Sequence, residues 1–398
     1  MPALPAVPVG LLEASGLVLA EPVVATRDVP SFANSAMDGY AVRAEDVRAV
    51  PVSLDVLEDL PAGYVAQASV EPGTAVKIMT GAPIPEGADA VVPVEDTELT
   101  DRRVLIRTSV PVGTNVRAVG GDVGAGTRVF AAGVRLRAAH LGVLASLGVA
   151  HPVVTRRPRV AILSTGDEVK PPDVDALQPG QIRDSNRMVL NSLLLDLGVD
   201  VLDFGIIPDD ADLLRSTLGR AAQDADAIIT SGGVSMGEYD LVKVVLGELG
   251  QINFWQVAMQ PGKPFAFGLL EGTPLFGLPG NPVSVMVAFE QFARPALLGM
   301  MGATNLYRPR VWGKFSRPVS TNPEKVVFLR VKAVPDYSGD WMAELSGGQL
   351  SNMLAAMAHG NAFAVIPVGT GTVPAGDRVE LEMFNWPETR TKDEVLDE

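Results

Sequence analysis

The chain has 398 residues, more than one hydrophobic core usually fills, so its length predicts two to four domains. Its 32 Lys and Arg against 47 Asp and Glu give a formal net charge of −15, which disfavours binding to nucleic acid or to an anionic membrane. The absence of cysteine excludes disulfides, thiolate ligands and cysteine nucleophiles, and with only three histidines any bound metal should be a hard cation held by oxygen.

The N-terminal segment does not read as a secretory signal. Residues 1–12 contain three prolines and no basic residue. The longest stretches without charge, 138–155 and 272–289, contain Pro, Gly or His and predict buried core rather than a membrane span. A cytoplasmic protein is therefore expected.

The first part of the chain is predicted to be mainly β. An apolar pattern favours a helix over 11–20, and a second helix is expected at 137–148. Between them, residues 28–155 are rich in Gly, Pro and Val, and short strand-like runs alternate with turns. The clearest of these runs are 52–60, 74–79, 88–95 and 103–108.

Residues 158 to about 300 alternate strand and helix patterns, which predicts a parallel sheet covered by helices on both faces. In the first helix Ser185 is the expected N-cap and Gly198 the residue that ends it. The expected strands are 159–165, 199–207, 226–230, 265–270 and 273–278, and the expected helices are 185–198, 209–223, 239–250 and 281–299.

The last part of the chain is again predicted to be β. After about residue 307 apolar and polar residues alternate between Gly- and Pro-containing turns, which indicates a small β-barrel or sandwich. The expected strands are 310–316, 325–334, 341–345, 361–368 and 377–384. The fold class is thus multi-domain α/β, with a central doubly wound parallel-sheet domain between β domains.

Four polar loops should meet at the carboxyl edge of the central sheet, where open α/β sheets bind ligands: 164–168, 205–210, 231–240 and 278–284. In the last loop Asn281 is a candidate N-cap with Pro282 at the first helical position. Each loop alone could be a solvated turn. Together they supply glycines, hydroxyls and acids, which suits a phosphate-type ligand with Mg²⁺ bridging to carboxylates. The acids are Glu168, Asp209, Asp210, Glu238 and Asp240.

Other motifs are weaker or absent. Asp38 precedes Gly39 in a small, apolar segment, and Thr80 precedes Gly81 in a Pro-rich one; both also fit ordinary turns. The dinucleotide pattern G-x-G-x-x-G is missing after the first strand of the central domain. The turn 261–263 is not a Walker loop because Pro264 follows it, and no G-x-S-x-G elbow exists.

Six segments in register resemble the MoeA-type molybdopterin molybdenumtransferase family, which is similar to the E domain of gephyrin. The resemblance runs from about residue 30 to 290, and the C-terminal β pattern extends it over nearly the whole chain. The segments are NSAMDGYAVR, IMTGAPIPEGADAVV, STGDE, SGGVSMGEYD, PGKPFAFG and GLPGNPVS.

The resemblance implies an architecture and a reaction. The subunit would have a linking domain (1–27 and 123–157), a mainly β domain (28–122), a MogA-like molybdopterin-binding domain (158–306) and a β-barrel domain (307–398). Two subunits would form a homodimer, with the active site between the doubly wound domain of one and the C-terminal domain of the other. The enzyme would bind adenylylated molybdopterin, insert molybdate and release AMP with Mg²⁺ present. A molybdopterin adenylyltransferase is a further candidate partner.

The resemblance also implies site residues. Asp240 and Glu168 would hold Mg²⁺. The catalytic set implied is Asp38, Thr80, Asp122, Glu168, Asp209 and Asp240. The phosphate- and substrate-binding set is Thr165, Gly166, Ser231, Gly232, Gly233, Ser235 and Asn281. The molybdate-binding set is Lys263, Pro264, Ser284, Arg330 and Ser351.

One segment departs from some members of the family. Gln256 and Gln260 stand where certain relatives carry lysines, and a glutamine offers an oxyanion only neutral donors. Local positive charge would then rest mainly on Lys263 and Arg330, so weaker molybdate binding than in a lysine-bearing relative is expected. Two other functions stay open: a gephyrin-like scaffold, and a pterin- or nucleotide-binding paralogue without catalysis.

Overall fold

A computed structural model describes residues 1–233, 241–336 and 338–387. The chain forms two compact units, which we describe separately. The first unit consists of Met1–Val7, Gly16–Val18 and Thr155–Glu398, and the second of Pro8–Ser15 and Leu19–Val154. The predicted division into four domains with the boundaries given above stays a prediction. No described helix is both long and apolar enough to cross a membrane.

The second unit is mainly β, as predicted. Its main sheet has the strand order β8-β5-β7-β6-β10-β9 and buries apolar residues on both faces, in the clusters around Tyr40 and around Ile78. Its strands are β5 (Gly39–Val42), β6 (Val52–Leu60), β7 (Thr74–Ile78), β8 (Ala90–Pro93), β9 (Thr97–Thr100) and β10 (Arg103–Ile106), with a 3₁₀ turn at Val94–Asp96.

Short strand pairs complete the second unit, together with helix α1 (Ala138–Ser146), which lies within the predicted range 137–148. The pairs are β11 (Val116–Arg117) with β4 (Asn34–Ser35), and β12 (Arg128–Phe130) with β3 (Val23–Val24). A three-stranded sheet has the order β1 (Ala6–Pro8), β13 (Val153–Thr155), β2 (Val18–Leu19).

The predicted helix over 11–20 is wrong. That segment forms turns and then enters β2, because Gly16 takes a left-handed conformation (φ 78°) that interrupts a helix. The apolar residues Leu17, Val18 and Leu19 are all buried, and Val18 belongs to the core of the central domain with Val160 and Ile162.

The central sheet of the first unit has the order β17-β14-β18-β22-β21-β19. Its strands are β14 (Arg159–Thr165), β17 (Asp200–Ile207), β18 (Ala227–Ser231), β19 (Gly250–Gln256), β21 (Pro264–Leu270) and β22 (Thr273–Leu278), and β15 (Val169–Lys170) pairs with β16 (Ile182–Arg183) beside it. Four strands are parallel as predicted, but β21 runs antiparallel to both of its neighbours, so the sheet is mixed. The cause is local. Glu271 and Gly272 both have positive φ and make a two-residue hairpin turn between β21 and β22.

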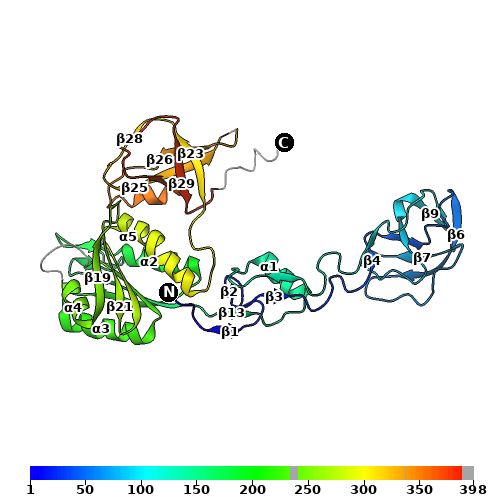
Figure 1. Cartoon of the computed structure of the whole chain (residues 1–398), viewed down its shortest axis with the longest axis horizontal. Coiled ribbons are helices and arrows are strands. Elements are labelled where there is room, and N and C mark those ends of the chain that lie inside the picture. Colours follow the sequence, from blue (N-terminus) through cyan, green and yellow to red (C-terminus); the bar gives the residue numbers. More distant parts are fainter. Residues whose placement is uncertain (234–240, 337, 388–398) are drawn as a thin grey trace. The chain divides into compact units, whose positions relative to one another are not determined.

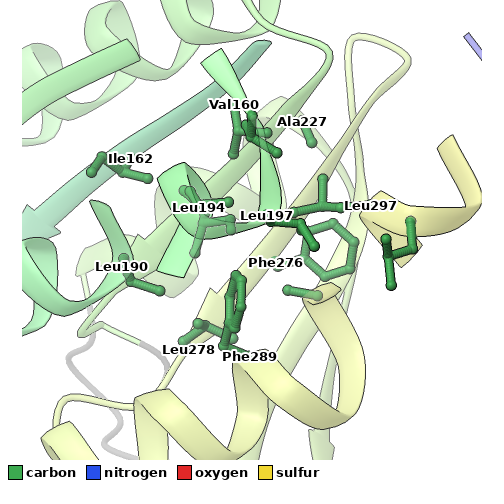
Figure 2. Close-up of a cluster of buried hydrophobic side chains, with 14 of the residues drawn as sticks. Val160, Ile162, Leu190, Leu194, Leu197, Ala227, Phe276, Leu278, Phe289 and Leu297 are labelled. Carbon is green, nitrogen blue, oxygen red and sulfur yellow. The ribbon is translucent and has the colours of Figure 1, made fainter. Parts of the chain in front are cut away.

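Helices cover both faces of this sheet (Figure 1). Along β14 the residues alternate between two cores: Val160 and Ile162 face α2 (Asn186–Leu197) and α5 (Pro282–Ala288), whereas Ala161 and Leu163 face α3 (Ala211–Asp224) and α4 (Leu241–Leu249). Figure 2 shows the first core, in which Leu190, Leu194 and Leu197 of α2 meet Phe276 and Phe289. A fully buried strand in a doubly wound domain needs this two-sided apolar pattern.

The predicted helix 281–299 is interrupted. It consists of α5, a π-helical turn (Phe289–Ala293) and α6 (Arg294–Met300). Asn281 is the N-cap and Pro282 the first helical residue, as predicted. At the first helix of the domain the predicted N-cap, Ser185, makes no capping hydrogen bond; the carboxylate of Asp184 accepts one from the Arg187 N–H at 3.1 Å instead.

The C-terminal part is a closed barrel, one of the two predicted alternatives. Its sheet has the order β20-β25-β26-β23-β29-β27, and an additional pairing of β25 with β27 closes it. The strands are β20 (Met259–Gln260), β23 (Arg310–Phe315), β25 (Val326–Pro335), β26 (Trp341–Leu345), β27 (Ala362–Ile366) and β29 (Arg378–Met383), with the pair β24 (Val319–Ser320) and β28 (Thr372–Val373) and the short helix α7 (Ala355–Ala358). β20 comes from the segment between β19 and β21, so the central domain contributes one strand to the barrel.

Candidate functional site

A cavity of about 1020 Å³ lies at the carboxyl edge of the central sheet. The parallel pairing of β14, β18 and β22 brings the ends of these strands side by side, with Ser164 opposite Ser231 and Ser231 opposite Leu278. Loops of the barrel domain of the same chain form part of its wall. Of the residues implied by the resemblance, the cavity brings together Thr165, Gly166, Glu168, Asp209, Gly232, Gly233, Lys263, Pro264, Asn281, Ser284 and Ser351.

The glycines of this rim are explained largely by backbone geometry. Gly232 has φ 93°, and a Cβ there would come within 3.1 Å of the Thr165 carbonyl oxygen. Gly233 has φ 68°, and a Cβ there would overlap Val242. The N–H of Gly232 donates to the Leu278 carbonyl and that of Gly166 to the Ile207 carbonyl, both at 3.2 Å. These two amides are therefore engaged in the fold and are not free donors for a phosphate.

The neighbouring acids Asp209 and Asp210 have different roles. Asp210 caps α3: its carboxylate accepts hydrogen bonds from the N–H groups of Asp212 and Leu213, both at 2.9 Å. Asp209 lines the cavity instead, as does Glu168, whose carboxylate folds over Gly166. Asp210 is thus a structural residue, and the carboxylates that face the cavity in the described part of the chain are Glu168 and Asp209.

These two carboxylates suit a magnesium ion that is partly held by its ligand. Among residues 1–233, 241–336 and 338–387, no three Asp, Glu or His side chains converge as a metal-binding group. Mg²⁺ commonly binds through one or two carboxylates together with substrate phosphates and water, and the oxygen donors here fit that pattern. Asp240 and Ser235, both implied by the resemblance, lie outside the described residues, as does Glu238.

Ser231 lies behind the cavity rather than in its wall. It is 3% exposed, and its hydroxyl accepts a hydrogen bond at 2.8 Å from Asn186 Nδ2, which also donates to the Gly280 carbonyl at 2.7 Å. Asn186 therefore ties the end of β18 to the loop before α5. The sequence analysis missed this residue, although its place directly after the predicted N-cap was a signal that its side chain could reach the sheet edge.

The barrel meets the start of α5 at Ser351. The Val283 N–H, in the first turn of α5, donates to the Ser351 carbonyl at 3.1 Å, so this amide of the helix N-terminus is not left for a ligand. Ser284, one residue further, is 4% exposed and lines the cavity together with Ser351 and Lys263. Hydroxyls and a lysine thus share one part of the lining with the barrel loop.

Arg330 lines a second, smaller cavity of about 320 Å³. Gln260 and Gln349 line both cavities, so the two are neighbours. Arg330 is 1% exposed; its Nη2 donates to the carbonyls of Gly348 (3.0 Å) and Leu350 (3.2 Å), and its Nε has no partner. No ion pair joins it to an acid in the described part of the chain. Burial accordingly lowers the pKa of Arg330 to about 10.

Two residues of this region were missed by the sequence analysis. The side chain of Gln349 is fixed by the backbone of Arg330: it accepts from the N–H at 2.9 Å and donates to the carbonyl at 3.1 Å. Lys325 lines the large cavity. Conversely, Gln256 ends β19, is exposed and does not line either cavity, so only Gln260 of the two glutamines can affect binding directly.

Asp38 and Thr80 form a pair in the second unit. The Asp38 carboxylate accepts hydrogen bonds from the Thr80 N–H and hydroxyl, both at 2.7 Å. The backbone hydrogen bond, and then that of the hydroxyl, lower the pKa of Asp38. Asp122 is exposed in the turn that follows Gly120 and Gly121. That these three residues act together with the large cavity stays a prediction.

Comparisons with known proteins agree with the resemblance. Three family models match in chain order: the MoeA N-terminal region (domain I and II) over 2–148, the probable molybdopterin binding domain over 161–299, and the MoeA C-terminal region (domain IV) over 313–384. The chain is 42% identical over 383 residues to molybdopterin molybdenumtransferase 2 of Mycobacterium tuberculosis (strain H37Rv), an alignment that covers 94% of each protein.

Two further matches extend over the same length. The chain is 40% identical over 384 residues to the molybdopterin molybdenumtransferase of Haemophilus influenzae, which covers 94% of this chain and 93% of that protein. The crystal structure of the molybdopterin biosynthesis moeA protein from Pyrococcus horikoshii OT3 superposes with a TM-score of 0.82 at 29% identity and covers 96% of both chains. With matches at this identity over nearly its whole length, the chain belongs to the molybdopterin molybdenumtransferase family and is an enzyme of the transferase class.

Proposed function

We propose that this enzyme acts in molybdenum cofactor synthesis: it binds adenylylated molybdopterin, inserts molybdate and releases AMP in a reaction that depends on Mg²⁺. The observation that carries this proposal is the buried guanidinium of Arg330, which has no ion-pair partner among the described residues and lines a cavity of about 320 Å³ next to the larger one of about 1020 Å³. A buried cation without an acid is costly unless a ligand supplies the negative charge. A tetrahedral oxyanion is such a ligand, and the larger cavity has room for a nucleotide-activated pterin.

The residues divide into two groups by chemistry. Lys263, Ser284, Ser351 and Arg330 supply hydrogen-bond donors for the molybdate oxygens, since ammonium, hydroxyl and guanidinium groups all donate to an oxyanion. Pro264 follows Lys263 and starts β21, which fixes the backbone direction at the lysine. Thr165, Gly166, Gly232, Gly233 and Asn281 shape the rim on which the adenylate end rests, and we place Ser231 and Ser235 with them.

Mg²⁺, when bound, would neutralise phosphate charge at the adenylate end. Glu168 and Asp209 are the cavity carboxylates that can hold it, with Asp240 as the third acid of the proposed set. Without the ion, two carboxylates beside a phosphate would repel it, so we expect them to hold the adenylate only as part of a metal-bridged contact.

The proposal includes the assembly implied by the resemblance. We propose a cytoplasmic homodimer in which Asp38, Thr80 and Asp122 contribute from the N-terminal domains, and which receives its substrate from a molybdopterin adenylyltransferase. Because the barrel and the doubly wound domain of one chain already line a common cavity, the dimer is not needed to bring those two domains together.

The direct test measures AMP released from adenylylated molybdopterin by the purified full chain. We expect release when molybdate and Mg²⁺ are both supplied, and none when either is omitted. Release that ignores molybdate would contradict the insertion reaction. Binding of the substrate without any release would favour a non-catalytic paralogue. In the Asp240→Asn variant we expect release to fall sharply, and activity equal to that of the native enzyme would remove Asp240 from the proposed set.

A further inference from the structure

The cavity contains a cation that the sequence motifs did not identify. Gln260 offers only neutral donors where a lysine would bring a charge, which leaves the predicted anion site short of positive charge at that point. Lys325 lines the same cavity as Gln260 and Lys263, although it lies 65 residues further along the chain than Gln260, in the barrel domain. Whether it can replace the missing charge depends on where its side chain begins and on what else it binds.

The strand pairing places Lys325 next to Gln260. β20 pairs in parallel with β25, with Met259 opposite Val326 and Gln260 opposite Val327. The Val326 N–H donates to the Ala258 carbonyl at 3.0 Å, which anchors the start of β25 against this segment. Lys325 immediately precedes β25 and is two residues from Val327, the residue that pairs with Gln260. Both polar side chains line the cavity, in agreement with this register.

A fixed turn holds the backbone of Lys325. The Asn322 side chain accepts a hydrogen bond from the Glu324 N–H at 2.9 Å, and the Gly369 N–H donates to the Pro323 carbonyl at 2.7 Å. The barrel therefore holds the backbone at Lys325, and the flexible part of this residue is its side chain. A positioned lysine loses less freedom on binding a ligand than one on a mobile loop.

The charge of Lys325 is not neutralised by the described residues. Lys314 and Lys77 pair with Asp340 and Asp59, at 2.6 and 3.0 Å. Lys325 makes no such ion pair within 1–233, 241–336 and 338–387, and the cavity acids Glu168 and Asp209 are not its partners there. Its side chain is half-buried at the cavity wall. An ammonium group without an ion-pair partner among the described residues, in a cavity that neighbours the one lined by Arg330, favours a doubly charged anion.

We propose that Lys325 binds the molybdate oxyanion at the boundary between the two cavities and supplies the positive charge that Gln260 lacks. The inference rests on the proposed function, which it deepens by adding an anion-binding residue from the barrel. It adds Lys325 to the expectation that positive charge at the site rests mainly on Lys263 and Arg330. It also revises the expected weakness of molybdate binding: the cation is displaced across the β20–β25 pairing rather than lost.

The test titrates inorganic molybdate into the purified full chain by calorimetry. For Lys325→Gln we expect affinity to fall about tenfold, the effect of removing one charge-assisted hydrogen bond at a partly exposed site. Lys332→Gln is the matched control, because Lys332 is an exposed lysine of the same strand, β25, that does not line the cavity. It should bind molybdate as the native protein does.

A second variant separates charge from other effects of the substitution. Adding Gln260→Lys to Lys325→Gln should restore most of the lost affinity, because it returns a cation to the lining of the same cavity. Equal affinities of the native protein and Lys325→Gln would overturn the role of Lys325 while leaving the proposed function in place. If the double variant does not regain molybdate affinity, the claim that Lys325 supplies the charge that Gln260 lacks is overturned. If the native protein does not bind molybdate at all, both the inference and the proposed function fall.

Discussion

Two arginine sites in the first unit make an instructive comparison: at one, a half-buried arginine pairs with a buried acid, and at the other a buried arginine has no acidic partner among the described residues. At the seam between the barrel and the helices α5 and α6, Arg308 makes two hydrogen bonds of 2.9 Å to the buried carboxylate of Glu290. Burial alone would lower the pKa of Arg308, but the hydrogen bond and charge of Glu290 outweigh it, so the pKa is raised. At the small cavity no acid pairs with Arg330 among the described residues, and burial lowers its pKa to about 10.

The difference separates structural charges from functional ones. Arg310 and Glu382 repeat the paired arrangement at the seam, with a contact of 3.0 Å, and Gln291 from the π-helical turn also binds Glu382. These acids have their partners within the chain: Arg310 and Glu382 pair within the barrel, between β23 and β29, whereas Gln291 joins Glu382 to the π-helical turn. Arg330 has no acidic partner among the described residues, and its cavity neighbours the larger one that is lined by most of the other candidate site residues. A perturbed group with an unmet partner at a cavity is where a ligand site is expected.

The largest expected effect follows from removing the unpaired charge. In Arg330→Met we expect AMP release to fall by about 100-fold or more, which is typical of the loss of one preorganised oxyanion donor. Thermal stability should stay the same or rise, because the variant no longer buries a lone cation. Activity assays and thermal unfolding of the same preparation check both results. A large loss of stability would show that Arg330 is structural, like Arg308.

Removing the acid of the Glu290–Arg308 pair should have the opposite result, a loss of stability with little change in ligand binding. Glu290→Gln leaves the guanidinium of Arg308 without its carboxylate, so we expect a loss of about 3 kcal/mol in the stability of the barrel–helix seam, with little change in molybdate affinity in the folded protein. Urea unfolding measures the first and calorimetry the second. The control is Glu380→Gln: Glu380 is the more exposed acid of the same network and should cost under about 1 kcal/mol. Equal losses for both variants would argue against the buried pair as the source.

A smaller effect on stability is expected from Asp226, which lies where the N-terminal ends of β14 and β18 meet. Asp226 binds the Arg156 guanidinium at 2.7 and 2.6 Å and the Arg159 N–H at 2.8 Å. Burial raises the pKa of Asp226, but these hydrogen bonds lower it further than burial raises it. The folded-state pKa thus lies below the ordinary 3.8, so the stabilisation is present above about pH 4 and is lost as the pH falls through the folded-state value.

Replacing Asp226 tests whether its ionised carboxylate stabilises the folded protein. For Asp226→Asn we expect a loss of about 1–2 kcal/mol at pH 7, and the difference from the native protein should shrink as the pH falls below 4. Chemical denaturation at a series of pH values measures it. A difference that stays constant down to pH 2 would show that the carboxylate charge is not the source of the stabilisation.

Much of the fold can be predicted from local patterns in the sequence. Residues 159–165 alternate between two apolar faces, and this run alone indicates a strand buried on both sides. The turn at Glu271 and Gly272 is also a local signal, because two residues between two apolar runs are typical of a hairpin; the expectation of a parallel sheet did not take it into account, and β21 is antiparallel. The failed helix at 11–20 shows the limit of such patterns, because the burial of its apolar residues, such as Val18 in the core of the central domain, is created by the tertiary structure.

The site was less accessible to the sequence. Loop glycines and acids pointed to the correct edge of the sheet, but the sequence could not distinguish Asp209, which faces the cavity, from Asp210, which caps a helix. Lys325 and Gln349 carry no motif, and they reach the site only because β20 leaves the central domain and pairs with β25. The isolation of Arg330 depends on which acids fail to approach it, and this is a property of the folded chain.

The most direct test of the distinction between paired and unpaired arginines is a crystal structure with molybdate, in which anomalous scattering locates the molybdenum atom. We expect the anomalous peak at the boundary marked by Gln260 and Gln349, with a molybdate oxygen within hydrogen-bond distance of the Arg330 guanidinium. A peak elsewhere in the molecule, with the Nε of Arg330 still without a partner, would contradict the claim that this charge is kept for the oxyanion.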